Sequence, residues 1–112
     1  MAEIVFVIHI RPGHEELDRK RRDEMTVARR DEYVAALKDA GITRQTIWRQ
    51  RTPDGRTLAI VYVEATDADG PRRLTSSDSD FSRWFAERMQ EIYGRDVSQV
   101  PLPVEMDHDF RV

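Results

Sequence analysis

Three histidines are the residues best suited to proton transfer near neutral pH, and two of them lie in apolar, strand-like segments. His9 falls within residues 3–10 and His108 within residues 104–111. Because side chains alternate between the two faces of a strand, we place His108 with the apolar set towards the helices and His9 on the opposite face. The two histidines then form no pair, and His108 is the candidate acid or base. A hydrogen-bonded structural role is the alternative for each.

An arginine in a predicted long helix is the second chemical candidate. Helical spacing places Arg30 in the middle of an apolar stripe formed by Val27, Val34 and Leu37. A guanidinium there can hold a carboxylate or phosphate through its planar fork, or pair with an acid of the protein. The aromatic residues expected to line the space between helix and sheet are Tyr33, Trp48, Tyr62 and Trp84. We take these four as candidate substrate-binding residues, with core packing as the alternative.

Several classes of site lack their characteristic residues. The sequence has no cysteine, which excludes disulfides and thiolate catalysis, and its five glycines are isolated, which argues against a phosphate-binding loop. We therefore expect no cofactor. A metal site built from His9, Asp107 and Asp109 is geometrically conceivable, but that spacing is nonspecific, and the predicted site contains no metal.

The charge balance bears on partners and location. Charged residues make up 35% of the chain, yet the net charge is only −3, which indicates a well-solvated surface and no nucleic-acid partner. The basic run at residues 19–22 is flanked by acids, so we interpret it as pairs on a helix surface. The apolar run at residues 4–8 is too short to be a signal-peptide core or a membrane span. With no cysteine, these features predict a cytoplasmic protein without a membrane partner.

Periodicity and turn residues predict the order β-α-β-β-α-β. The predicted strands are residues 3–10, 44–52, 57–65 and 104–111, and the predicted helices are residues 14–40 and 79–93. The polar stretch between the third strand and the second helix is expected to hold a helical turn near residues 72–74. Right-handed crossovers give an α+β, ferredoxin-like domain over residues 1–112, with a four-stranded antiparallel sheet and both helices on one face. The predicted core residues are Ile4, Phe6, Ile8, Val34, Leu37, Ile60, Trp84, Phe85 and Met106.

Four segments together resemble the dimeric α/β-barrel superfamily: FVIHIRPG, EYVAALKDAGITRQTIWRQ, LAIVYVEA and SDFSRWFAERM. Within it, the chain resembles a small family of unknown function. The resemblance implies a homodimer of face-packed sheets, with a pocket between sheet and helices in each subunit. Residues 32–48 are also similar to L-rhamnose mutarotases, whose catalytic histidine lies upstream in the long helix. Thr26 stands near that place here, so the mutarotase active site is not carried over.

Two functional hypotheses follow. The first is a small-molecule-binding protein or a cofactor-independent enzyme, of isomerase, cyclase or monooxygenase type, in which His108 is the acid or base and Arg30 fixes an oxygen of the ligand. The second is a non-catalytic dimeric protein-interaction module.

The predicted homodimer buries the sheet face opposite the helices, where Val5, Val7, Val61 and Val63 are expected. Glu105, Asp107 and Asp109 of one copy would approach Arg49 and Arg51 of the other. Solvation of both charged sets is the alternative, because exposed ion pairs contribute little.

Overall fold

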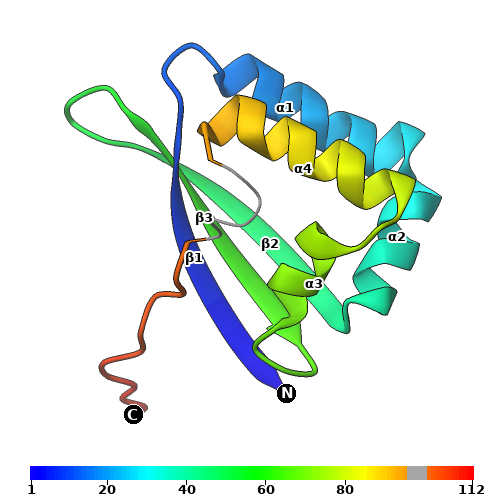
Figure 1. Cartoon of the computed structure of the whole chain (residues 1–112). Coiled ribbons are helices and arrows are strands. Elements are labelled where there is room, and N and C mark those ends of the chain that lie inside the picture. Colours follow the sequence, from blue (N-terminus) through cyan, green and yellow to red (C-terminus); the bar gives the residue numbers. More distant parts are fainter. Residues whose placement is uncertain (96–100) are drawn as a thin grey trace.

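The computed structural model describes residues 1–95 and 101–112, and it shows an antiparallel sheet with helices packed on one face (Figure 1). The strands are β1 (Ala2–Ile10), β2 (Ile42–Arg51) and β3 (Thr57–Ala65), in the order β1-β3-β2. Each begins and ends within two residues of its predicted position. The predicted hairpin between β2 and β3 is confirmed, and Gly55 takes the positive φ of 85° that its turn requires.

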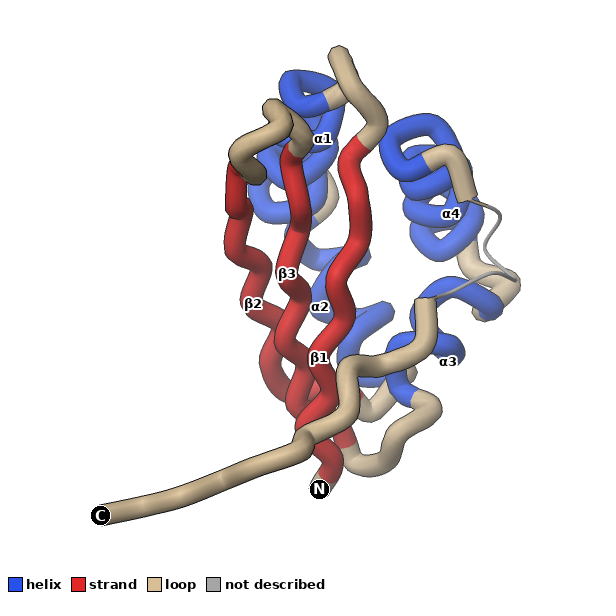
Figure 2. Tube along the Cα trace, turned by 90° about the vertical axis from the view of Figure 1, so that its left-hand side faces the viewer, coloured by secondary structure: helices blue, strands red, loops and turns tan. Residues whose placement is uncertain are grey.

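The helices cover one side of the sheet, as Figures 1 and 2 show from two directions. The predicted helix over residues 14–40 is present as three successive segments, with a π-helical turn in the middle. Gly41 follows the last of them with φ 74°, as expected for a helix-ending glycine. The helical elements are α1 (Glu15–Asp23), the π-helical turn η1 (Glu24–Ala28), α2 (Arg30–Asp39), α3 (Gly70–Ser76) and α4 (Asp80–Tyr93).

The sheet face against the helices is formed by the expected residues of β1 and by an unexpected set of β3. Phe6 pairs with Val61 across the two strands, and both are buried. Our placement of Val61 and Val63 on the opposite face is therefore wrong. Both alternating sets of β3 are apolar, and the smaller one (Ala59, Val61, Val63 and Ala65) faces inwards, where it leaves room for the large side chains of the helices.

The opposite face of the sheet carries no helix. We call it the open face; it is formed by Val5, Val7, Thr46, Trp48, Leu58, Ile60 and Tyr62. Ile60 is half-buried there and not part of the main core. On β2 the inward set contains Ile47, Arg49 and Arg51, so the prediction that Arg49 and Arg51 lie on the open face is also wrong.

The predicted core is confirmed for Ile4, Phe6, Ile8 and Phe85, which are buried. Val34, Leu37 and Trp84 are half-buried. The buried side of the long helical segment differs from the predicted stripe, since Val27 is 77% exposed and Arg30 is also exposed. The stripe that packs inwards holds Asp18, Arg21, Met25, Tyr33 and Ala40. Its first two members are charged, and for this reason hydrophobic periodicity did not reveal it.

The fourth predicted strand is absent from the sheet. Residues 104–111 are extended, but the one backbone hydrogen bond joining this segment to the sheet runs from Val104 N to Val5 O, at 2.6 Å. A strand needs a continuous ladder of such bonds, and the segment leaves the edge of β1 after the first. Met106 is consequently exposed, contrary to its predicted place in the core.

Candidate ligand-binding site

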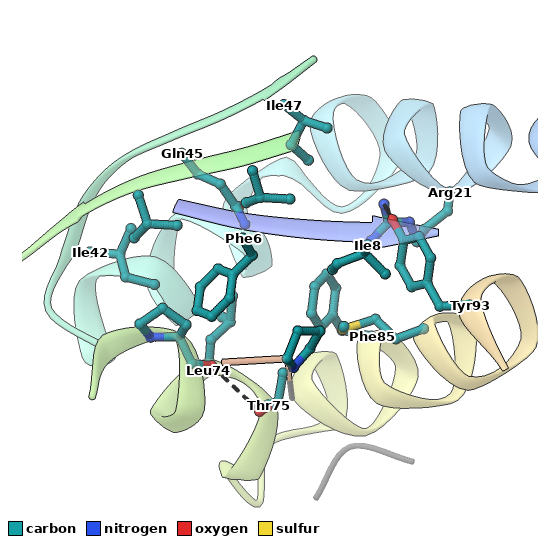
Figure 3. Close-up of a pocket in the computed structure, with 15 residues that line it drawn as sticks. Phe6, Ile8, Arg21, Ile42, Gln45, Ile47, Leu74, Thr75, Phe85 and Tyr93 are labelled. Carbon is teal, nitrogen blue, oxygen red and sulfur yellow. Dashed lines mark hydrogen bonds between the residues drawn. The ribbon is translucent and has the colours of Figure 1, made fainter. Parts of the chain in front are cut away.

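A pocket of about 60 Å³ lies between the inward face of the sheet and helices α3 and α4, and it is partly open to solvent (Figure 3). The small inward side chains of β3 leave space for it. Its walls are mainly apolar, and Phe85 of α4 faces the sheet across it. Polar side chains enter it from three elements: Arg21 from α1, Gln45 from β2 and Thr75 from α3. The apolar lining comprises Phe6, Ile8, Ile42, Ile47, Val61, Val63, Pro71, Leu74, Phe85, Met89 and Pro101, with Tyr93 beside Arg21.

Arg21 lies at one end of this pocket and is only 4% exposed. One of its terminal nitrogens, Nη2, donates to Asp18 Oδ1 at 2.9 Å and to the Tyr93 hydroxyl at 3.1 Å. Its guanidinium carbon lies 5.5 Å from the ring centroid of Phe85, as in a cation–π contact. The Nε of Arg21 is buried and has no hydrogen-bond partner among the described residues. The Nε atoms of Arg22, Arg49 and Arg88 are likewise buried without a partner among the described residues, and of the four arginines Arg21 lines the pocket. Burying such a donor without an acceptor is costly.

Asp18 holds the cluster together from beneath Arg21. Its side chain is fully buried, and it accepts hydrogen bonds from Arg22 at 2.7 Å and from Arg49 at 2.8 Å. The Tyr93 hydroxyl lies 3.2 Å from its Oδ1. The carboxylate therefore joins α1, β2 and α4, whose side chains approach it from three directions.

The cluster carries more positive than negative charge. Burial raises the pKa of Asp18, but the hydrogen bond from Arg49 and the charges of Arg21 and Arg22 outweigh it, so the pKa lies below its ordinary value. One carboxylate thus serves three guanidinium groups. Glu15 is a further acid beside the cluster: its main-chain carbonyl accepts from Arg49 at 2.7 Å, and its carboxylate lies 3.4 Å from the Thr57 hydroxyl. Even when Glu15 is counted, a net positive charge remains beside the pocket.

The tyrosines near the pocket are neutral hydrogen-bonding groups. Burial raises the pKa of Tyr93, opposed by Arg21 and reinforced by Asp18. Burial likewise raises the pKa of Tyr33, opposed by Arg21. The Tyr33 hydroxyl donates to Gln45 Oε1, which fixes the orientation of that amide at the pocket wall. Both phenols therefore remain protonated at neutral pH.

The structure does not bring the predicted acid or base and the predicted arginine together. His108 lies in the exposed C-terminal segment, where its ring stacks on Phe110, and not towards the helices as predicted. Arg30 is exposed at the start of α2 because the buried stripe runs along another side of the helix. Neither residue lines the pocket between sheet and helices.

The four predicted aromatic residues also occupy separate places. Trp48 and Tyr62 lie on the open face, on the far side of the sheet from the pocket. Trp84 is half-buried on α4, with the Arg29 guanidinium 4.6 Å from its ring centroid. Tyr33 alone bears on the pocket, through its hydrogen bond to Gln45.

The sequence did contain a signal for the buried cluster. Asp18 is followed by Arg21 and Arg22 at the i+3 and i+4 positions, the spacing of helical ion pairs. Because acids flank the basic run at this spacing, we interpreted these pairs as contacts on a helix surface. The pairing is confirmed, but it lies inside the protein. Its decisive partner, Arg49, comes from a strand 31 residues away, which helix spacing does not reveal.

Comparisons with known proteins agree with this architecture. No family model matches the sequence, and no curated protein sequence matches it. Among solved structures, the crystal structure of L-rhamnose mutarotase from Formosa agariphila superposes with a TM-score of 0.61 at 12% sequence identity, covering 100% of this chain and 99% of that chain. The two chains share a fold. The distant similarity to rhamnose mutarotase-like proteins is therefore confirmed in three dimensions, and at this identity it concerns the fold alone.

Proposed function

We propose that the chain binds a small molecule in the pocket between sheet and helices, and that this ligand has an apolar body and a carboxylate or carbonyl oxygen. The observation that carries the proposal is the buried Arg21, whose unpartnered Nε lies in a cluster with excess positive charge at the end of an apolar pocket. An acceptor oxygen there would satisfy the donor and part of the charge. The ligand's apolar part would contact Phe85 and Leu74 and extend towards the mouth.

A sugar fits this lining less well than an apolar acid does. A monosaccharide presents hydroxyl groups around its whole ring, and each one buried without a partner carries a desolvation cost. The polar side chains of the pocket wall are few, chiefly Arg21, Gln45 and Thr75. The named activity of the mutarotase with the same fold, acting on L-rhamnose, is therefore the second candidate and not the first.

Cofactor-independent catalysis is compatible with the same arrangement, through polarisation of a carbonyl oxygen by Arg21. The groups around Arg21 are poorly matched to acid–base chemistry at pH 7, since Asp18 is held ionised and the tyrosines are held neutral. Binding is therefore the primary proposal, and an isomerase-like or cyclase-like reaction would need its proton acceptor from the ligand or water.

The test is a calorimetric titration with matched probes: benzoate, benzyl alcohol and L-rhamnose. Benzoate and benzyl alcohol share a ring and differ in the anionic group, so the proposal expects benzoate to bind at least about tenfold more tightly. Preference for L-rhamnose, or equal binding of the two aromatic probes, would contradict it.

A variant whose larger side chain fills the pocket tests whether benzoate binds there. Ile47→Phe enlarges a half-buried side chain that lines the pocket, and should abolish benzoate binding. Val27→Phe adds a ring at an exposed position of η1 and should leave binding unchanged.

We also propose that the chain forms a homodimer through the open face of its sheet. Trp48 and Val7 are exposed there in a single copy, and a second copy related by a two-fold axis would cover both. The dimeric α/β barrel expected from the sequence would result. If the chain binds none of the probes but is dimeric, a non-catalytic interaction module becomes the better account.

A further inference from the structure

The C-terminal residues 104–112, which we call the arm, project from the body of the protein. After its single hydrogen bond to β1 at Val5, the arm runs as an extended chain to the C-terminus, with every residue exposed. In Figures 1 and 2 it leaves on the side of the sheet that faces away from the helices. This is the side of the open face.

The arm has the residue pattern of a strand that rests on an apolar surface. Val104, Met106, His108 and Phe110 alternate with Glu105, Asp107 and Asp109, so an extended chain turns the apolar residues and His108 to one side and the acids to the other. Met106 and Phe110 are 72% and 75% exposed. Leaving several large apolar side chains in water is unfavourable, and a row of them typically marks an interaction surface.

The arm's own sheet does not cover it. The bond at Val5 anchors the arm at the outer edge of β1, and both views show the rest of the chain leading away from that sheet. Nine extended residues reach roughly 30 Å. Three strands are only about 10 Å wide from first to last. The arm is thus long enough to cross the sheet of a neighbouring molecule.

Charge also favours a second copy of this chain. On the open face, the edge strand β2 carries the exposed Arg44, in register with Glu64 of β3. Glu64 lies 3.7 Å from Arg44 and neutralises it in part, so Arg44 is the cation that the open face of β2 offers to the acids of the arm. Arg111 lies 3.7 Å from Asp109, which leaves Glu105 and Asp107 as the arm's free acids within the described part of the chain.

We infer that two copies exchange their arms: the arm of each copy lies across the open face of the other, with Met106 and Phe110 against Trp48 and Ile60. This inference rests on the proposed homodimer and adds contacts that would hold its two subunits together. Because Pro101, just before the arm, lines the pocket of its own chain, arm exchange would also connect the dimer interface to the pocket mouth.

Cysteine crosslinking tests the exchange, and the chain has no native cysteine to interfere. A Met106→Cys chain is mixed with a Trp48→Cys chain, equilibrated and oxidised. We expect a disulfide-linked heterodimer in excess of the products from either variant alone. The matched control replaces the second variant with Val27→Cys, whose exposed position lies on the helical side, and should give no such excess.

Light scattering separates the outcomes. Removal of residues 104–112 should weaken dimerisation by at least about tenfold, because the apolar contacts of both arms are lost. If the full-length chain is dimeric but the mixed crosslink fails, or truncation leaves dimerisation unchanged, arm exchange is overturned and the dimer stands. If the full-length chain is monomeric at micromolar concentration, dimer and exchange both fall, while benzoate binding remains a separate measurement. A disulfide within one chain of the Met106→Cys, Trp48→Cys double variant would instead show that the arm folds onto its own sheet.

Discussion

At the scale of single residues, Asp18 determines whether the buried arginines are tolerated. Three guanidinium groups converge on a fully buried carboxylate, and removal of its charge leaves them uncompensated. We expect Asp18→Asn to lower the free energy of unfolding by roughly 3–5 kcal/mol, as measured in denaturant. Asp23→Asn, at an exposed position of the same helix, is the control and should change it by less than about 0.5 kcal/mol. A loss below about 1 kcal/mol for Asp18→Asn would contradict a structural role for the cluster.

The same carboxylate predicts how stability depends on pH. Its pKa in the folded protein is lowered by Arg49, Arg21 and Arg22 against the effect of burial, whereas the unfolded chain has the ordinary value of about 3.9. The stabilisation is therefore present above pH 3.9 and is lost as the pH falls through the folded pKa. The difference in unfolding free energy between wild type and Asp18→Asn should be flat from pH 7 to 5 and shrink below about pH 4. A difference that grew on acidification would have the wrong sign.

At the scale of elements, the long helical segment shows what its sequence reveals and conceals. Its extent follows from a composition rich in helix-forming residues, and its end follows from Gly41. Its buried side does not, because Asp18 and Arg21 occupy inward positions that a hydrophobic pattern assigns to solvent. The buried face of β3 is ambiguous for the opposite reason. The strand is apolar on both faces, and only packing against the helices determines which face is buried. For this reason the pocket could not be located from the sequence, although the elements around it could.

The orientation of the helical segment is tested by a pair of substitutions in η1. Met25 is buried and Val27 is exposed, although the sequence pattern assigned Val27 to the core. Met25→Ala should cost roughly 2–5 kcal/mol of unfolding free energy, and Val27→Ala less than about 0.5 kcal/mol. Equal losses in chemical denaturation would contradict this orientation.

The faces of the sheet are tested in the same way on β1. Phe6 packs in the core beneath the helices, while Val7 lies on the open face. Phe6→Ala should destabilise the chain by roughly 3–5 kcal/mol. Val7→Ala should change dimer dissociation more than it changes the unfolding of a dissociated chain, which is measured by denaturation at low concentration. A negligible effect of Phe6→Ala would reverse the assignment of the two faces.

At the scale of the whole molecule, the two partners that we propose would use two different surfaces. The proposed small molecule would meet Arg21 in the pocket, and the proposed second copy would meet the exposed apolar side chains of the open face and the arm. The sequence placed the residues expected at these surfaces differently from the structure. His108 was predicted in the pocket and lies on the arm, and Arg49 was predicted on the dimer face and binds Asp18. Arg49 changes place because it contacts Asp18, 31 residues away in sequence, and His108 because the arm leaves the sheet after its hydrogen bond at Val5.

A crystal structure of the chain grown with benzoate tests the central claim most directly, because it locates the ligand's carboxylate. The account predicts that a carboxylate oxygen lies within about 3 Å of Arg21 Nε, with the aromatic ring against Phe85 and Leu74. Benzoate bound elsewhere, or bound in the pocket with its carboxylate directed away from Arg21 towards solvent, would contradict the assignment of Arg21 as the ligand's anchor.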